Sequence, residues 1–68
     1  MKLIDSILAS TIEAGDNIEV WDDVVERYVI ETVTSVEDIG AHMEVCTEEN
    51  PDGWHILADS MINIYGPE

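Results

Sequence analysis

The sequence predicts a mainly β protein with a single domain over residues 1–68, and three features lead to this prediction. Residues 50–53, Asn-Pro-Asp-Gly, form a strong turn sequence, because proline presets φ and glycine accepts the left-handed backbone that closes such a turn. Apolar and acidic residues alternate around Glu19, as in a half-buried strand. Residues 27–36 are rich in Val, Ile, Thr and Tyr, which favour extended backbone. Together these features predict four to five short strands.

The first ten residues place Leu3, Ile4, Ile7 and Leu8 at the spacing of one helix face. This pattern predicts a short helix at the N-terminus. No residue suited to capping a helix precedes it, so a strand beginning within residues 7–9 stays open as an alternative.

The next segment, residues 11–21, contains the turn sequence Gly15-Asp16-Asn17, followed by Ile18 and Val20 on either side of Glu19. A short apolar segment, a Gly-Asp turn and an alternating strand also open small SH3-like β-barrels, which this stretch resembles over about ten residues. The resemblance implies a small SH3-like barrel as the fold, and it implies no activity.

Residues 22–38 fit two patterns. Asp23 followed by Glu26 has the form of a helix capping box, and the apolar residues after it also fit helical spacing. The density of β-branched residues favours a strand instead. We therefore predict a loop over 22–26, a strand over about 27–36 and a turn over 38–40. The alternative is a helix over 23–33, which would make the fold α+β.

The turn at residues 50–53 predicts a β-hairpin, and residues 61–65 predict a final strand with Ile62 and Ile64 on one face. With a loop over 51–53, Val45 would face Asp59, and Trp54 would lie on the face opposite to Val45. Both faces hold apolar residues, so the pattern leaves open which face belongs to the core.

Charge is the most informative property for function. The chain contains sixteen Asp and Glu residues, and Lys2 and Arg27 are its two Lys and Arg residues, which gives a net charge of −14. Solubility requires a net charge of only about 2–8 for a small domain. The excess argues against direct binding to nucleic acid or to anionic lipid, both of which need Lys and Arg. It indicates a function for the negative field.

No set of residues predicts catalysis or metal binding. His55, Asp59 and Ser60 offer a base, an acid and a hydroxyl, but nothing indicates a strained nucleophile turn. His42, Glu44 and Cys46 alternate onto one side of a strand and could contribute to a zinc site, yet structural zinc needs four well-placed ligands. We therefore expect no enzyme activity, no metal and no cofactor.

The location of the protein follows from a few absences in the sequence. Cys46 is the single cysteine, so no internal disulfide can form, which suits a reducing compartment. We see no signal peptide and no apolar run long enough to span a membrane. We expect a cytoplasmic protein that binds no membrane.

The first functional hypothesis is an acidic inhibitor that binds a basic, nucleic-acid-binding protein. Duplex DNA presents one negative charge per about 3.4 Å of axis on each strand, and rows of carboxylates on a sheet can imitate it. In size and charge the chain resembles the DNA-mimic inhibitors of phages, of the anti-restriction and anti-CRISPR type, which implies a phage-encoded protein. The candidate contact residues are Glu19, Trp21, Asp22, Asp23, Glu31, Glu37, Asp38, Glu44, Glu48 and Glu49.

The alternative hypothesis is an SH3-like adaptor or structural module whose acidity only keeps it soluble. Its contacts would be apolar, around Trp21 or Tyr65. Tryptophan is enriched at binding hot spots, and Trp21 lies beside two aspartates, which favours the surface. Trp54 is expected in the core.

Overall fold

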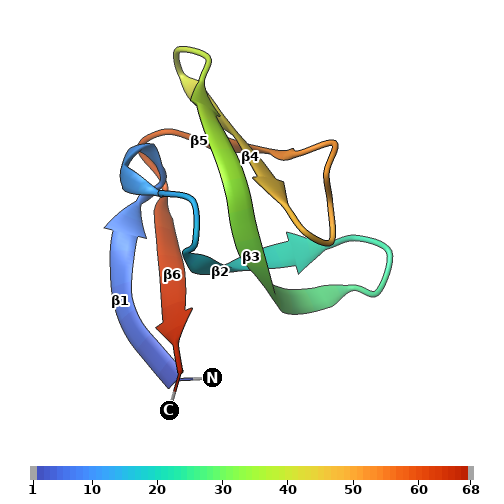
Figure 1. The fold of residues 1–68 in the computed structure, drawn as a ribbon. Coiled ribbons are helices and arrows are strands. Elements are labelled where there is room, and N and C mark those ends of the chain that lie inside the picture. The colour runs from blue at the N-terminus through green and yellow to red at the C-terminus, as the bar shows by residue number, and fades with distance from the viewer. Residues whose placement is uncertain (1, 68) are drawn as a thin grey trace.

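The computed structural model describes residues 2–67, which form six β-strands and one turn of 3-10 helix (Figure 1). The 3-10 turn η1 covers Ala9–Thr11, and residues 2–67 contain no α-helix. The mainly β prediction is confirmed, although the strands number six and not four to five. Their bounds are β1 (Lys2–Leu8), β2 (Asn17–Asp22), β3 (Arg27–Asp38), β4 (His42–Thr47), β5 (Trp54–Leu57) and β6 (Met61–Gly66).

All six strands belong to one open antiparallel sheet in the order β1-β6-β2-β3-β4-β5. Strands β2 to β5 form a meander, and β6 returns to lie between β1 and β2 (Figure 1). The first part of β3 pairs with β2, and the part beyond a register shift between Val33 and Ser35 pairs with β4. Because such a bulge bends a strand and increases its twist, β3 can pair with β2 along its first part and with β4 along its second part, and the sheet curls between them.

The predicted N-terminal helix is wrong, because these residues form the edge strand β1. Each of its residues from Lys2 to Leu8, apart from Ile4, is paired with β6. Ile4 sits at a register shift between Leu3 and Asp5. Apolar residues at helical spacing do not exclude a strand here, since β6 supplies the backbone partners that an isolated strand would lack.

The strand predicted over about 27–36 is confirmed as β3, and the alternative helix over 23–33 is wrong. A tight turn over residues 23–26 precedes the strand. Asp22 closes it, because its Oδ1 accepts hydrogen bonds from the backbone nitrogens of Val24 (2.8 Å) and Val25 (3.4 Å). Glu26 then adopts a positive φ of 53°, which a helix would not allow. The acidic residues that resemble a helix cap therefore stabilise a hairpin turn.

The hairpin around residues 50–53 is confirmed, but its predicted register is wrong. Gly53 donates a backbone hydrogen bond to the Asn50 carbonyl, as the turn requires. The loop, however, extends over residues 48–53, and Val45 pairs with Trp54 where Asp59 was expected. Two hydrogen bonds stabilise this longer loop and so explain the difference. The Asn50 nitrogen donates to Thr47 Oγ1, and the Glu48 nitrogen donates to the carbonyl of Thr32 on β3.

The observed register settles which hairpin face joins the core. Met43 pairs with Ile56 and Val45 pairs with Trp54, so all four side chains share the inner face. Trp54 is half-buried against the core, as expected. The final strand is also confirmed as β6, whose Ile62 and Ile64 pack against the core.

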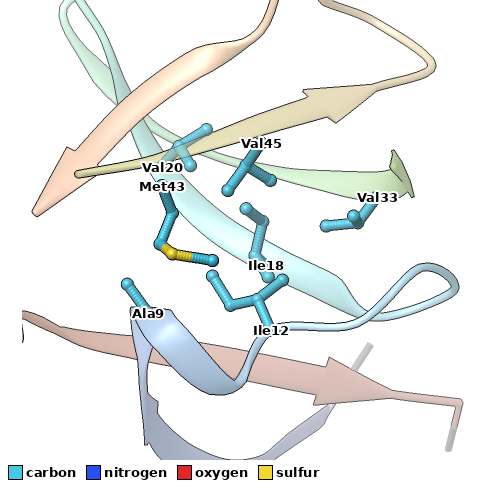
Figure 2. Close-up of a cluster of buried hydrophobic side chains, with 7 residues drawn as sticks. All are labelled: Ala9, Ile12, Ile18, Val20, Val33, Met43 and Val45. Carbon is cyan, nitrogen blue, oxygen red and sulfur yellow. The ribbon is translucent and has the colours of Figure 1, made fainter. Parts of the chain in front are cut away.

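The hydrophobic core lies inside the curled sheet (Figure 2). Ile18 and Val20 from β2 face Met43 and Val45 from β4. Ala9 in η1 and Ile12, which follows η1, cover one end of the core. Along β2 and β4 these buried side chains alternate with less buried ones, which confirms the predicted half-buried strand over 18–20. The cluster consists of Ala9, Ile12, Ile18, Val20, Val33, Met43 and Val45.

Candidate binding surface

Nearly all the acidic side chains of residues 2–67 lie at the surface without a basic partner. The exception in burial is Glu31, which is 6% exposed. The single ion pair within this range joins His55 Nε2 to Glu44 Oε2 at 3.5 Å, and it requires a protonated histidine. Neither Lys2 nor Arg27 pairs with a carboxylate of residues 2–67. The negative field is therefore largely uncompensated at short range.

The predicted contact residues fall into separate places on the fold. Glu19, Trp21 and Asp22 lie on β2, and Asp23 lies in the turn that follows. Glu37 and Asp38 end β3, Glu44 lies on β4, and Glu48 and Glu49 lie in the loop after β4. Glu31 lies inside the molecule, so it is unable to contribute to a contact surface.

Glu31 holds three strands together. Its Oε1 accepts hydrogen bonds from Thr47 Oγ1 at 2.6 Å and from the Trp54 indole nitrogen at 2.8 Å. Thr47 Oγ1 in turn accepts a hydrogen bond from the backbone nitrogen of Asn50. A buried carboxylate is tolerated only when it is hydrogen-bonded, and these donors satisfy that requirement. Glu31 is a structural residue.

A short row of charge crosses the outer face of β3 and β4. Glu37 lies directly opposite Glu44, which lies opposite His55 on β5. Carboxylates directly opposite on neighbouring strands repel each other, and this pair forms the part of the predicted carboxylate rows that the register brings together. Glu48 lies beyond the end of β4 and does not extend the row.

The β2–β3 hairpin carries exposed apolar and aromatic side chains together with its acids. Val24 is 91% exposed at the turn, and Trp21 and Tyr28 are 47% and 64% exposed just behind it. The two rings pair edge to face, with centroids 5.1 Å apart and planes inclined by 75°. Exposed aromatic residues of this kind are typical of interaction sites. We call residues 21–28 the hairpin tip.

A groove of about 350 Å³ opens beside the hairpin tip. It forms because β2 and β6 pair only at Asn17–Tyr65 and Ile18–Ile64 and have no further pairing beyond these positions. Val20, Ile56 and Ile62 supply apolar lining, and aromatic and polar side chains complete it. We call this site the aromatic groove, and its remaining lining residues are Glu19, Trp21, Tyr28, Trp54, His55, Met61 and Asn63.

Glu19 is the carboxylate of the aromatic groove, and two neighbours hold its side chain. Asn63 Nδ2 donates to Oε1 at 3.2 Å, and the Tyr65 hydroxyl donates to Oε2 at 2.8 Å. The hydrogen bond to Glu19 raises the pKa of the Tyr65 hydroxyl above its ordinary value of 10.0, with smaller contributions from desolvation and from the charge of Glu19. Glu19 is thus held in place beside the aromatic rings.

Sequence reasoning found Glu19 and Trp21 but missed most of the groove. The predicted loop over 22–26 would pair Trp21 with Arg27, whereas the observed turn over 23–26 pairs Trp21 with Tyr28, so this aromatic pair was missed by one residue. Trp54, Met61 and Asn63 reach the site from β5 and β6. Their placement depends on the hairpin register and on where β2 and β6 diverge, for which the sequence contains no local signal.

Other kinds of site have little support in the described part of the chain. Residues 2–67 contain no cluster of three or more His, Cys, Asp or Glu side chains placed to hold a metal ion. No helix in that range is long and apolar enough to cross a membrane. Comparison of the chain with protein-family models, with curated proteins and with solved structures finds no match.

Proposed function

We propose that this protein is a non-enzymatic, cytoplasmic inhibitor that binds a basic, nucleic-acid-binding protein by imitating the charge of DNA. The uncompensated surface charge carries the proposal, because the net charge is −14 and a single histidine supplies the one ion pair of residues 2–67. Such a field attracts cationic surfaces and accelerates association with them. The resemblance in size and charge to phage anti-restriction and anti-CRISPR inhibitors supports a phage-encoded protein of that type.

The contact surface that we propose is the hairpin tip, with the acidic residues around it. Asp23 and Glu26 are exposed there, and neither side chain makes a hydrogen bond within residues 2–67. Both carboxylates are therefore available to a basic partner. Trp21 and Val24 add apolar area next to these charges, as a protein interface requires for affinity.

A second candidate function is an SH3-like adaptor that binds through apolar contacts. The exposure of Val24 and of the Trp21–Tyr28 pair favours it. In this case the acidic residues would only maintain solubility. The SH3-like barrel is also our proposal for the finer fold class: β6-β2-β3-β4-β5 is a continuous five-stranded unit, and β1 adds a sixth strand outside it.

Binding to a panel of purified basic nucleic-acid-binding proteins tests the first function, with duplex DNA as the competitor. We expect a complex that DNA displaces and that weakens at least tenfold between about 50 and 200 mM salt, as counterion release requires. Binding that ignores both DNA and salt, or no binding to any basic protein of the panel, would contradict the proposal.

Two variants separate the candidate functions. Asp23→Lys combined with Glu26→Lys should abolish binding by charge mimicry and leave apolar binding nearly intact. Trp21→Ala should abolish apolar binding and weaken binding by charge mimicry only by about two- to fivefold. Asp22 is left unchanged, because its carboxylate holds the turn through Val24 and Val25. Asp59→Lys combined with Glu13→Lys is the matched control, since both residues are exposed and lie outside the hairpin tip.

A further inference from the structure

We propose that the aromatic groove binds an arginine side chain of the basic partner, with Glu19 as the counter-ion and Trp21 as a stacking surface. This inference rests on the proposed function, because it names the group that the partner inserts. The field of the whole protein would attract any cationic surface, whereas the groove would select one side chain at one place.

The geometry of the groove fits a single long side chain. Its volume of about 350 Å³ lies at the lower end of the range for ligand pockets, which is roughly 300–1,000 Å³. Val20, Ile56 and Ile62 provide apolar surface for the methylene groups of arginine. The groove is open to solvent beside the hairpin tip, so a side chain from a docked protein can enter it.

Glu19 provides the charge in a fixed position. Its carboxylate offers about four acceptor sites, and Asn63 and Tyr65 occupy two of them. The remaining acceptor sites can take two donors of a guanidinium group, which binds carboxylates in a bidentate manner. Among residues 2–67, His55 is the one basic side chain that lines the groove, so the charge of Glu19 is available to a ligand.

The aromatic residues favour arginine over lysine. Trp21 and Tyr28 are both exposed, and in an edge-to-face pair at least one face of each ring is free of the other ring. A planar guanidinium stacks on such a face and loses less hydration than an ammonium group does. One site thus combines a held carboxylate with aromatic surface.

Titration of the whole protein with a blocked Gly-Arg-Gly peptide tests the inference, followed by NMR of the backbone and the two indole groups. The control ligand is the same peptide with citrulline, which has the shape of arginine without its charge. We expect the arginine peptide to shift the resonances of Trp21, Tyr28 and Glu19, and the citrulline peptide to bind at least about tenfold more weakly, since charged hydrogen bonds are lost.

The variants use Glu37 as the matched control for Glu19. Glu19→Gln keeps an oxygen that Asn63 and Tyr65 can still contact, and it should weaken the arginine peptide at least about tenfold. Glu37→Gln removes the same charge from the outer face of β3 and should change the affinity less than about twofold, because exposed charges are screened at physiological salt. Trp21→Leu should weaken binding by about two- to fivefold.

Three results would overturn the inference without touching the proposed function: equal binding of both peptides, equal losses in Glu19→Gln and Glu37→Gln, or no shift in the groove while a basic protein still binds. Each would leave the overall field as the source of attraction. The proposed function fails separately, if no basic protein binds in competition with DNA.

Discussion

The indole nitrogen of Trp54 donates a hydrogen bond to the Glu31 carboxylate at 2.8 Å, which ties β5 to β3 across the intervening strand β4. The two residues are 23 positions apart in the chain. Through Thr47, the same carboxylate also reaches the loop that begins the hairpin turn. Glu31, which was expected at the surface, therefore links β3, β4 and β5 through hydrogen bonds.

Replacement of Glu31 should destabilise the fold. Glu31→Ala removes the acceptor of two partly or fully buried donors, and we expect the free energy of unfolding to fall by about 1–3 kcal/mol. Glu31→Gln keeps one oxygen and should lose less. Urea denaturation measures both, with Glu49→Ala on the exposed loop as a control that should stay within about 0.5 kcal/mol of the parent. Equal stability of Glu31→Ala and Glu49→Ala would contradict the structural role.

Neutralisation of Glu37 should stabilise the protein. Glu37 lies directly opposite Glu44, so Glu37→Gln relieves a like-charge contact, and we expect a gain of about 0.2–1 kcal/mol at low salt. The gain should shrink toward zero near 1 M salt, where the screening length is about 3 Å. Asp59→Asn removes the same charge from an exposed turn. Thermal melts at two salt concentrations should show the larger gain for Glu37→Gln, and equal gains would show that only net charge matters.

The Tyr65 hydroxyl should lose its proton at a higher pH than an ordinary tyrosine does. Ultraviolet absorbance in a Tyr28→Phe background follows Tyr65 alone, and we expect its pKa above 10.0 because it donates to Glu19. Adding Glu19→Gln removes the charge and should lower this pKa toward its ordinary value. An unshifted titration in the Tyr28→Phe protein would show that the contact does not persist in solution.

The same contact predicts how stability changes at high pH. The folded pKa of Tyr65 lies above the unfolded pKa, so the folded state holds this proton more tightly. The stabilisation is fully present below about pH 10 and is lost as the pH rises through the folded pKa. Thermal melts should therefore show a smaller alkaline loss of stability once Glu19 is replaced by Gln.

Gly53 should tolerate alanine less well than Gly40. Both have a positive φ, 93° for Gly53 and 98° for Gly40, so alanine strains the backbone at both positions by about 1 kcal/mol or more. At Gly53 the added Cβ would also meet Glu44 Cγ at 3.0 Å and Cys46 Sγ at 3.3 Å, whereas at Gly40 it meets nothing within 4 Å. Denaturation curves should show the greater loss for Gly53→Ala, and equal losses would mean that the neighbouring side chains move aside freely.

Turns and most strands could be predicted from the sequence because their causes are local. The turn at residues 50–53 depends on the backbone preferences of proline and glycine, and Ile18 and Val20 alternate with polar neighbours in β2. The strand over 27–36 follows from its β-branched residues, and the turn that precedes it depends on an aspartate close to the nitrogens that it binds. The surface position of Trp21 also follows from its neighbours in sequence, the two aspartates that come after it.

By itself, then, the sequence determined a mainly β chain, the positions of its turns and the excess of negative charge. Only the tertiary structure decided that residues 2–8 form a strand, that the hairpin pairs Val45 with Trp54, that Glu31 is buried and that an aromatic groove surrounds Glu19. Each of these depends on backbone or side-chain partners far away in the chain, such as β6 for β1 and Thr32 for Glu48. A change of register by one residue exchanges the two faces of a strand, so local preference leaves these features undetermined until the whole sheet pairs.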